Sequence, residues 1–313
     1  MNDSTTFLSA NDEHRIALHT WLIDDMAKVK GVVHWLHGMA EHGARYARLG
    51  EVLNQIGWNL VCHDHRGHGN SMDTDAPAGH FADKRGWVKV QSDVATVQNW
   101  IKNTFVGIPV VLAGHSMGSL IARYYAESIQ ENYLPTIKGL IMCGSDYHTP
   151  FYYRLMRLPL QLEALRLGKR SVSPLTKALT FSAWNKQFKP NRTAFDWLSS
   201  VNASVDDYIN DPLCGQDTSI TLWLDLVTAL TSMDSPARIA ALPKNLPVLL
   251  IGGNQDPMSQ NGKGMRALAK ALNRYSQTEV AAIQFEGRHE ILNDACAPQV
   301  LQTIGQWLAD IPD

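Results

Sequence analysis

The chain has 313 residues, enough for one large domain or two of ordinary size. Hydrophobic residues make up 45% of it and charged residues 19%, which excludes a collagen-like, low-complexity or disordered chain. A formal net charge of −2 also excludes the bulk positive field that a nucleic-acid-binding protein needs.

Two short apolar runs, 7–10 and 14–23, predict a hairpin that adds antiparallel strands at one edge of a sheet. From Gly31 onward, short apolar runs alternate with longer amphipathic ones. This alternation predicts a mostly parallel sheet, of about eight strands in all, with helices on both faces. The expected strands are 31–36, 58–62, 109–113, 137–143, 247–251 and 279–285, and the expected helices are 44–56, 87–105, 117–129, 263–272 and 297–308.

The alternation is interrupted between residues 147 and 238. This stretch is rich in Leu and aromatic residues, has no strand-like run, and is expected to be helical with breaks at its prolines. We interpret it as a helical cap inserted over the C-terminal edge of the sheet, and a second independent domain is the alternative. The expected breaks are at Pro159, Pro174, Pro190 and Pro212.

Residues 114–118 form a GxSxG sequence between a predicted strand and a predicted helix. The pentapeptide alone is a weak signal, but in this context it predicts a nucleophile elbow with a strained Ser116 at the tip of the turn. Strand and helix then approach so closely that only glycine fits at Gly114 and Gly118. A tight Gly-rich turn without chemistry is the alternative.

A serine hydroxyl is a weak nucleophile near neutral pH, so it needs a base, and the base needs an orienting acid. With an elbow serine the chain order is Ser, acid, His, with the acid after a late strand and the His after the last one. Asp256 and His289 occupy these two places. Asp146, which follows the strand at 137–143, is the main rival for the acid.

Acyl transfer puts negative charge on the former carbonyl oxygen, which two backbone N–H groups must bind. We expect one from Met117, the residue after the nucleophile, and the other from Met39, after the first parallel strand. Gly38 permits the backbone twist that this loop needs. We expect His37 to orient the loop through hydrogen bonds.

Four motifs in this order resemble the α/β-hydrolase superfamily, and more narrowly its monoacylglycerol lipase and lysophospholipase branch. The resemblance covers the chain outside the interruption. It implies the α/β-hydrolase fold, with 1–146 and 239–313 forming one catalytic domain and 147–238 the inserted cap (lid). The motifs are 37–46 (HGMAEHGARY), 64–71 (DHRGHGNS), 114–118 (GHSMG) and 287–293 (GRHEILN).

The resemblance also implies roles for single residues. In relatives with the 37–46 loop, the Glu and Arg line a small polar pocket that receives a glycerol head, which suggests Glu41 and Arg45 here. An ion pair that holds the oxyanion loop is the alternative for these two residues. In the 64–71 loop the resemblance implies a buried pair between Asp64 and Arg66 rather than a metal site built from the histidines.

The cysteines and the N-terminus bear on the cellular compartment. The chain shows no signal-peptide pattern and no run of roughly 18 apolar residues that could span a membrane. The cysteines lie far apart without a CxxC motif, so we expect neither a disulfide framework nor a zinc site. We therefore expect a cytoplasmic protein without a metal or cofactor. The four cysteines are Cys62, Cys143, Cys214 and Cys296.

The triad and the resemblance favour a serine carboxylic-ester hydrolase that acts on single-chain lipids, either monoacylglycerol or lysophospholipid, through an acyl-enzyme on Ser116. Alternatives of the same fold are a general carboxylesterase or thioesterase, and an aminopeptidase whose cap carboxylates hold an α-amine. A non-enzymatic ligand-binding protein is disfavoured because all three triad residues are present. The carboxylates available for an amine are Asp206, Asp207, Asp211, Asp217 and Asp225.

One segment of the interruption is a candidate for peripheral contact with a membrane. Residues 151–158 mix aromatic and aliphatic side chains with arginine and contain no acid. Ordinary packing of the apolar side on the rest of the protein is the alternative. As a helix, the segment is expected to place Tyr152, Leu155 and Met156 on one side and Arg154 and Arg157 on another.

Overall fold

The computed structural model describes residues 4–132 and 134–311, which are built around one eight-stranded sheet. The strand order is β1-β2-β4-β3-β5-β6-β7-β8. β1 and β2 form the predicted antiparallel hairpin at one edge, β2 pairs antiparallel with β4, and the remaining pairings are parallel. The strands are β1 (Ser4–Ser9), β2 (Arg15–Trp21), β3 (Gly31–Leu36), β4 (Trp58–His63), β5 (Val110–His115), β6 (Gly139–Cys143), β7 (Pro247–Gly253) and β8 (Glu279–Phe285).

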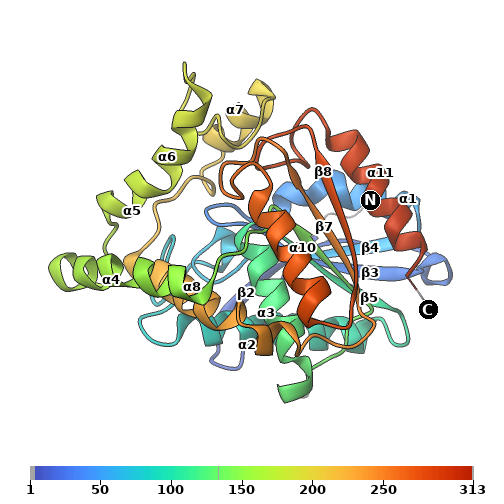
Figure 1. The fold of residues 1–313 in the computed structure, drawn as a ribbon. Helices are drawn as coiled ribbons and strands as arrows, with labels where there is room; N and C mark the ends of the chain where they lie inside the picture. The colour runs from blue at the N-terminus through green and yellow to red at the C-terminus, as the bar shows by residue number, and fades with distance from the viewer. Residues whose placement is uncertain (1–3, 133, 312–313) are drawn as a thin grey trace.

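Helices cover both faces of the sheet (Figure 1). One apolar core lies between the sheet and α2, α3 and α10, and a second lies between the opposite face and α1 and α11. The central strands are buried along their whole length, which is why they read as nearly continuous apolar runs. The predicted strands and helices of this part are confirmed, with ends shifted by a few residues. The helices are α1 (Ala47–Gln55), α2 (Gly86–Thr104), α3 (Met117–Asn132), α10 (Lys263–Tyr275) and α11 (Ala297–Ala309).

Between β6 and β7 the chain leaves the sheet and forms a group of helices at the left and top of Figure 1. Residues 147–238, all of them described, contribute no strand to the sheet. We call this stretch the helical insertion. Its helices are α4 (Pro150–Leu167), α5 (Pro174–Leu179), α6 (Phe181–Asn185), α7 (Asn202–Asn210), α8 (Ile220–Met233) and α9 (Pro236–Ile239), the last of which ends one residue beyond it.

The break predicted at Pro159 is wrong, because α4 continues through it to Leu167. A proline inside a helix removes one backbone hydrogen bond and often kinks the helix, but it does not have to end it. Here α4 packs along α8, and such tertiary packing supplies most of the stability of a helix in a protein. Pro174 begins α5, whereas Pro190 and Pro212 lie between helices.

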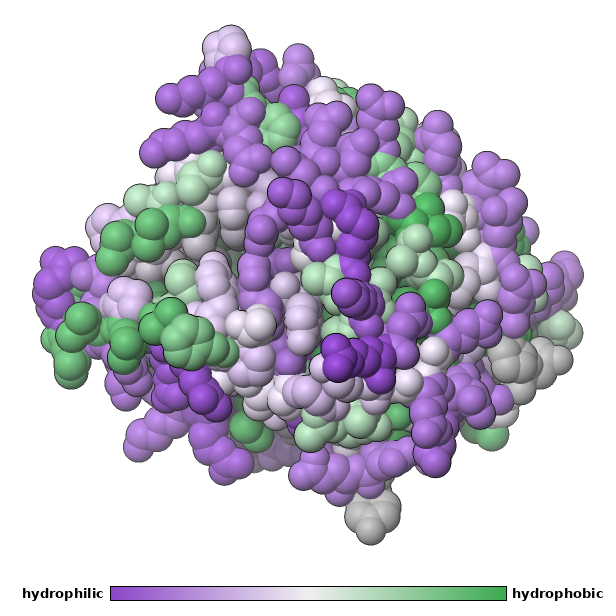
Figure 2. Space-filling model, in the orientation of Figure 1, coloured by the Kyte–Doolittle hydropathy of each residue, from purple (hydrophilic) through white to green (hydrophobic). Residues whose placement is uncertain are grey.

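The apolar face predicted for 151–158 is only partly correct. Met156 turns inward and packs against the core, while Tyr152 and Leu155 are 42% and 51% exposed. The exposed apolar row of α4 follows a spacing of four and three residues, and Figure 2 shows apolar side chains gathered over α4 at the left of the view. The row consists of Phe151, Leu155, Leu158, Leu162 and Leu165.

Candidate active site

Ser116 lies at the sharp turn between β5 and α3, and its φ is +53°. Its N–H donates to the carbonyl of Cys143 on β6 at 2.8 Å. A Cβ on Gly114 would lie 2.4 Å from the backbone of Gly118, and a Cβ on Gly118 would lie 2.1 Å from the Leu36 oxygen. The prediction that only glycine fits at these two positions is therefore confirmed, and the same close approach keeps the serine backbone strained.

The structure brings Asp256 and His289 together from the loops after β7 and β8. His289 Nδ1 lies 2.9 Å from Asp256 Oδ1, and the two side chains are at most 2% exposed. A carboxylate here fixes the imidazole with its hydrogen on Nδ1, so that Nε2 is the basic nitrogen. Asp146, the rival acid, pairs instead with His148, whose Nε2 lies 3.0 Å from Asp146 Oδ2.

The charge state of Asp256 follows from two opposing effects. Burial alone would raise the pKa of this carboxyl. The His289 imidazole and the hydrogen bonds that Asp256 accepts, including one from the Met258 N–H, outweigh burial and hold the pKa below its ordinary value. Asp256 is therefore ionised near neutral pH, as an orienting acid must be.

The loop after β3 carries Met39, the second expected oxyanion donor. The Gly38 N–H donates to Glu41 Oε1 at 2.5 Å, and Ala40 has a φ of +57°. His37 Nδ1 lies 2.7 Å from the Gly38 carbonyl oxygen, which confirms that His37 orients this loop by hydrogen bonding. Both backbone polar groups of Gly38, the residue directly before Met39, are thus hydrogen-bonded.

Glu41 and Arg45 form an ion pair, and a second carboxylate joins them. Arg45 Nη1 donates to Glu41 Oε2 at 2.5 Å, and the same guanidinium donates to both Glu290 oxygens at 2.8 Å. Glu41 and Glu290 line the cavity that contains Ser116, whereas Arg45 is not part of its lining. This geometry supports the ion-pair interpretation of Glu41 and Arg45. The sequence analysis missed Glu290, although its position directly after His289 could have pointed to it.

Electrostatics keep both carboxylates ionised. Burial would raise the pKa values of Glu41 and Glu290, but the Arg45 guanidinium holds both below their ordinary range. Burial alone would lower the pKa of His115, because it disfavours the charged imidazolium. A hydrogen bond to Glu41 at 3.2 Å and the charge of that carboxylate outweigh burial and raise this pKa. Two carboxylates therefore share one guanidinium beside Ser116.

The pair implied between Asp64 and Arg66 is wrong. Asp64 Oδ1 accepts from the Gly43 N–H at 2.7 Å and lies 3.1 Å from His19 Nε2. Arg66 turns to α2, where it forms a two-bond pair with Asp93 at 2.6 and 2.7 Å. The two residues point to different sides of their loop, and each is satisfied by a partner that is remote in sequence.

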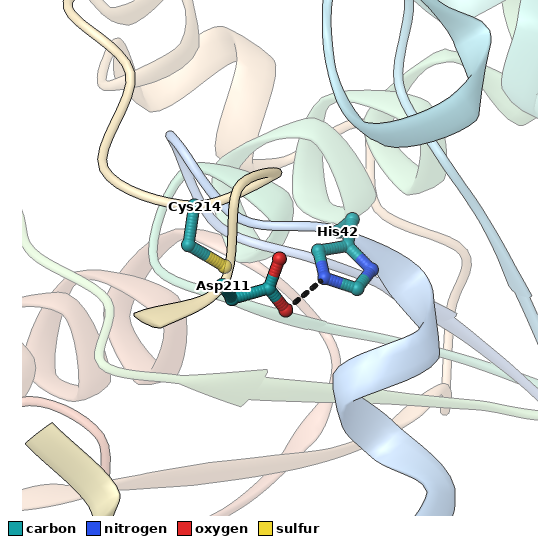
Figure 3. Close-up of side chains that lie close together, drawn as sticks. All are labelled: His42, Asp211 and Cys214. Atoms are coloured by element: carbon teal, nitrogen blue, oxygen red, sulfur yellow. Dashed lines mark hydrogen bonds and ion pairs between the residues drawn. The ribbon is translucent and has the colours of Figure 1, made fainter. Parts of the chain in front are cut away.

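One group of potential metal ligands exists among residues 4–132 and 134–311, and it joins the loop after β3 to the insertion (Figure 3). Donor atoms of His42, Asp211 and Cys214 lie within 4.8 Å of one another. His42 Nε2 is 2.8 Å from Asp211 Oδ2, the distance of a hydrogen bond. Burial raises the pKa of the Cys214 thiol although Arg45 opposes this, and a protonated thiol is a poor metal ligand. We therefore interpret the group as a contact between two segments.

Ser116 and His289 line a cavity of about 660 Å³, within the usual range of small-molecule sites. Met39 and Met117, the residues expected to supply the oxyanion donors, line the same cavity. Much of the remaining wall comes from α4, α5, α6 and α8 of the insertion and is apolar. Its residues include Met156, Leu160, Leu179, Phe181, Trp223 and Leu230.

Two aromatic rings that the sequence analysis missed flank the imidazole of His289. The ring centroids of Trp197 and His115 lie 4.9 and 4.8 Å from that of His289. Trp197 belongs to the insertion, and the next residue, Leu198, accepts a hydrogen bond from the Glu290 N–H at 2.7 Å. No local pattern marks Trp197, because its role arises only when the insertion folds against the loop after β8.

Comparison with known proteins agrees with this geometry. The family described as "Serine aminopeptidase, S33" matches residues 27–295. The chain belongs to this family, which places it among the α/β-hydrolases. A carboxyl esterase from Bacillus coagulans, solved in complex with glycerol, superposes with a TM-score of 0.86 at 24% identity and covers 99% of both chains. That likeness confirms the α/β-hydrolase fold.

Relatives similar over most of their length have lipase and lysophospholipase names. The monoacylglycerol lipase of Mycolicibacterium smegmatis is 31% identical over 94% of this chain and 92% of its own. The human monoglyceride lipase is 27% identical over 90% of this chain and 82% of its own. A probable lysophospholipase L2 of Haemophilus influenzae is 27% identical over 97% and 91%. The predicted family resemblance is thereby confirmed.

Proposed function

We propose that this protein is a serine carboxylic-ester hydrolase that acts on single-chain lipids. The observation that carries the proposal is the cavity, which joins Ser116 and the carboxylates of Glu41 and Glu290 to a wall of apolar side chains from the insertion. A single-chain lipid ester matches this cavity, because it consists of one apolar acyl chain joined to one polar head. The names of the relatives support the same substrate class.

The proposed reaction has two steps. His289 takes the proton of Ser116 Oγ, which attacks the ester carbonyl carbon, and the N–H groups of Met39 and Met117 bind the oxygen as it becomes negative. His289 then gives the proton to the departing alcohol oxygen, which leaves an acyl group on Ser116. A water molecule deprotonated by His289 attacks this acyl group, and the fatty acid leaves as Oγ regains its proton. Asp256 stabilises the imidazolium in both steps.

The polar end of the cavity favours monoacylglycerol over an anionic lysophospholipid. Arg45 is already shared by Glu41 and Glu290, at distances of 2.5 to 2.8 Å, so a phosphate would compete with two buried carboxylates for one guanidinium. A neutral glycerol head can accept or donate hydrogen bonds here without adding charge. The finer proposal is therefore a monoacylglycerol lipase.

The aminopeptidase alternative is less well supported. The carboxylates that the sequence offered for an α-amine have other partners: Asp206 pairs with Arg192, Asp211 with His42 and Asp217 with Lys177. Asp225 lies beside the backbone N–H groups of Gly86 and Trp87 at the start of α2, and Asp207 is exposed. These arrangements favour the ester as the substrate.

The helical insertion is the proposed cap, because five of its helices, α4 to α8, contribute side chains to the wall of the cavity. The outer side of α4 carries the exposed apolar row, 51% to 85% exposed, and Arg154 and Arg157 are exposed beside it. Its inner side, with Met156 and Leu160, lines the cavity. We propose that α4 rests on an anionic bilayer surface, with its apolar row in the interface and its arginines near the head groups.

Within the described residues, no helix is both long and apolar enough to cross a bilayer. All four cysteines are free thiols, which is consistent with the proposed location in a reducing compartment such as the cytoplasm.

A hydrolysis panel tests the proposed function. The purified protein is assayed for fatty acid release from monoacylglycerols of several chain lengths, lysophosphatidylcholine and diacylglycerol, and for cleavage of an aminoacyl arylamide. We expect a monoacylglycerol to be hydrolysed faster than the other substrates. We expect no hydrolysis of it by the Ser116→Ala variant. Cleavage of the arylamide without ester hydrolysis would overturn the assignment in favour of the aminopeptidase.

A further inference from the structure

The insertion donates two hydrogen bonds to a single carbonyl of the oxyanion loop. The Tyr208 hydroxyl donates to the Ala40 oxygen at 2.8 Å, and the Gly215 N–H donates to the same oxygen at 2.9 Å. Ala40 is the residue directly after Met39, the expected oxyanion donor. The insertion therefore bonds to the loop that has to present that donor to the substrate.

Ala40 has an unfavourable backbone conformation. Its φ of +57° lies in the left-handed region, which is unfavourable for a non-glycine residue and persists only where its surroundings enforce it. Ala40 is 4% exposed, so its carbonyl lies where an unpaired polar group is itself costly. The two donors from the insertion both satisfy this carbonyl and oppose relaxation of the backbone.

Further contacts fix the donating segment, 208–215, against the same loop. His42 Nε2 and Asp211 Oδ2 are 2.8 Å apart, and Figure 3 shows these side chains facing each other across the junction. The Arg45 guanidinium lies over the Tyr208 ring, 4.9 Å from its centroid. Tyr208 is 6% exposed, so its hydroxyl has little access to bulk water. Because the Tyr208 ring is buried and contacts the Arg45 guanidinium, its hydroxyl is held in one position.

The loop is consequently fixed from two sides. On the side of the sheet, Glu41 binds the Gly38 N–H. On the side of the insertion, Tyr208 and Gly215 bind the Ala40 carbonyl. Met39 lies between these two fixed points, and the direction of its N–H depends on both of them.

We propose that Tyr208 is a positioning residue for the oxyanion hole, and that it acts with the Gly215 N–H by holding the Ala40 carbonyl so that the Met39 N–H faces the reacting carbonyl. This inference rests on the proposed function, because it takes the Met39 N–H as an oxyanion donor in ester hydrolysis. The insertion then has a second task besides enclosing the acyl chain. It completes the geometry of the catalytic centre even for a substrate too short to reach its apolar wall.

The test compares Tyr208→Phe with the wild type on p-nitrophenyl acetate, a short soluble ester. Loss of one oxyanion donor costs on the order of 100- to 1000-fold in kcat, and a donor that is displaced rather than lost should cost about 10- to 100-fold. We expect a loss in kcat of that size with KM changed less than about two-fold. The affinity for a trifluoromethyl ketone, which binds as a negatively charged adduct of Ser116, should fall in step with kcat/KM.

Tyr125→Phe is the matched control. Tyr125 is buried in α3, and its hydroxyl also donates to a backbone carbonyl, that of Pro135, at 3.2 Å. Removing this hydroxyl should lower the melting temperature about as much as Tyr208→Phe does, and leave kcat and ketone affinity unchanged. A general loss of stability is thereby separated from a loss of positioning.

Asp211→Asn weakens the same segment at another contact and gives a second variant should Tyr208→Phe fold poorly. We expect a loss in kcat of several-fold, again with little change in KM. Wild-type kcat and ketone affinity in folded Tyr208→Phe would overturn the inference, and so would a change confined to KM, since Tyr208 also lines the cavity.

The outcome for this inference is distinguishable from that for the proposed function. If the wild type hydrolyses esters and Tyr208→Phe does so equally well, only the positioning role is wrong. If the wild type cleaves aminoacyl arylamides and no esters, the proposed substrate is wrong. The same comparison of variants then runs on the arylamide, because an amide also passes through an oxyanion.

Discussion

The two backbone segments beside the substrate carbonyl are held by different means. The elbow at Ser116 is shaped by its own backbone, since Gly118 lies so close to β3 that a Cβ there would meet the Leu36 oxygen at 2.1 Å. The loop that carries Met39 is held by its neighbours His37 and Glu41 and also by a distant group, since the Tyr208 hydroxyl that binds it is 168 residues away along the chain. The elbow is therefore a property of a pentapeptide in a sheet, whereas the loop that carries Met39 also bonds to the folded insertion.

This difference separates two kinds of defect. A change at the glycines of the elbow has to disturb the packing of β5, α3 and β3, and so the fold. A change at the contacts of the oxyanion loop can leave the fold intact and reduce the rate. The reference for both kinds of defect is a substitution that removes a catalytic side chain and leaves the elbow and the loop that carries Met39 unchanged.

Ser116→Ala has the largest expected effect. Loss of the triad nucleophile costs on the order of a million-fold in kcat, because the triad acts as a unit. The substitution leaves Gly114 and Gly118 in place, so the melting temperature should change little. Turnover of p-nitrophenyl acetate and a thermal melt check the two expectations, and substantial ester hydrolysis by the variant would contradict the role of the elbow.

Asp256→Asn should come next, with a loss of roughly ten-thousand-fold in kcat. An amide cannot hold the imidazole of His289 in the tautomer that leaves Nε2 basic. Asp146→Asn is the control, since this carboxylate pairs with His148 instead. Steady-state kinetics of both variants on a soluble ester decide between them, and the opposite ranking would mean that the acid has been misassigned.

Glu290→Gln tests the polar end of the cavity. Removing one of the two carboxylates that share Arg45 should improve use of an anionic head, with the charge effect on the order of 1 kcal/mol, or about five-fold. The measured quantity is the ratio of kcat/KM for monoacylglycerol to that for lysophosphatidylglycerol, which should fall. Glu286→Gln, an exposed residue of the same loop, has the same change in net charge and should leave the ratio unchanged. Equal ratios in both variants would exclude the proposed selection.

Substitutions on the outer face of α4 should have the smallest effect on activity. This effect should appear only with membranes or long-chain substrate. Combining Leu155→Asp with Leu162→Asp places two charges in the exposed row, which should weaken sedimentation with anionic liposomes and raise KM for a long-chain monoacylglycerol several-fold. Added salt should weaken binding of the wild type, because an arginine near an anionic surface contributes about 1 kcal/mol. Hydrolysis of a soluble acetyl ester should be unchanged.

Val106→Asp is the control for this prediction. Val106 is 80% exposed in the loop after α2, outside the insertion, so a charge there changes surface hydrophobicity without touching α4. We expect normal liposome binding from it. If the α4 variant loses activity on the short ester in step with the long-chain substrate, α4 is structural and does not contact the membrane.

The sequence was sufficient where the structure is locally determined. The strands and helices around the sheet have clear periodic patterns, and the order of Ser116, Asp256 and His289 follows the order in which a parallel sheet presents its loops. Each of these residues sits in the turn or loop after a strand that could be recognised. Their place at one end of the sheet therefore followed from topology, without knowledge of any side-chain contact.

The sequence was insufficient where partners meet only in the folded chain. Arg66 binds Asp93 on α2, whereas Asp64, two residues away, binds the Gly43 N–H, and neither partner is near in the sequence. The inward turn of Met156 depends on how α4 packs on its neighbours, which periodicity within one helix does not determine. Tyr208 and Trp197 gained their contacts with the catalytic loops in the same way.

The most direct measurement of the central claim is the mass of the intact protein after reaction with a fluorophosphonate, followed by mapping of the modified peptide. An activated serine at the elbow, with His289 as its base, should take one phosphonyl group, located on Ser116. The Ser116→Ala protein should take none. Modification that persists in Ser116→Ala, or a wild type that remains unmodified, would contradict the account.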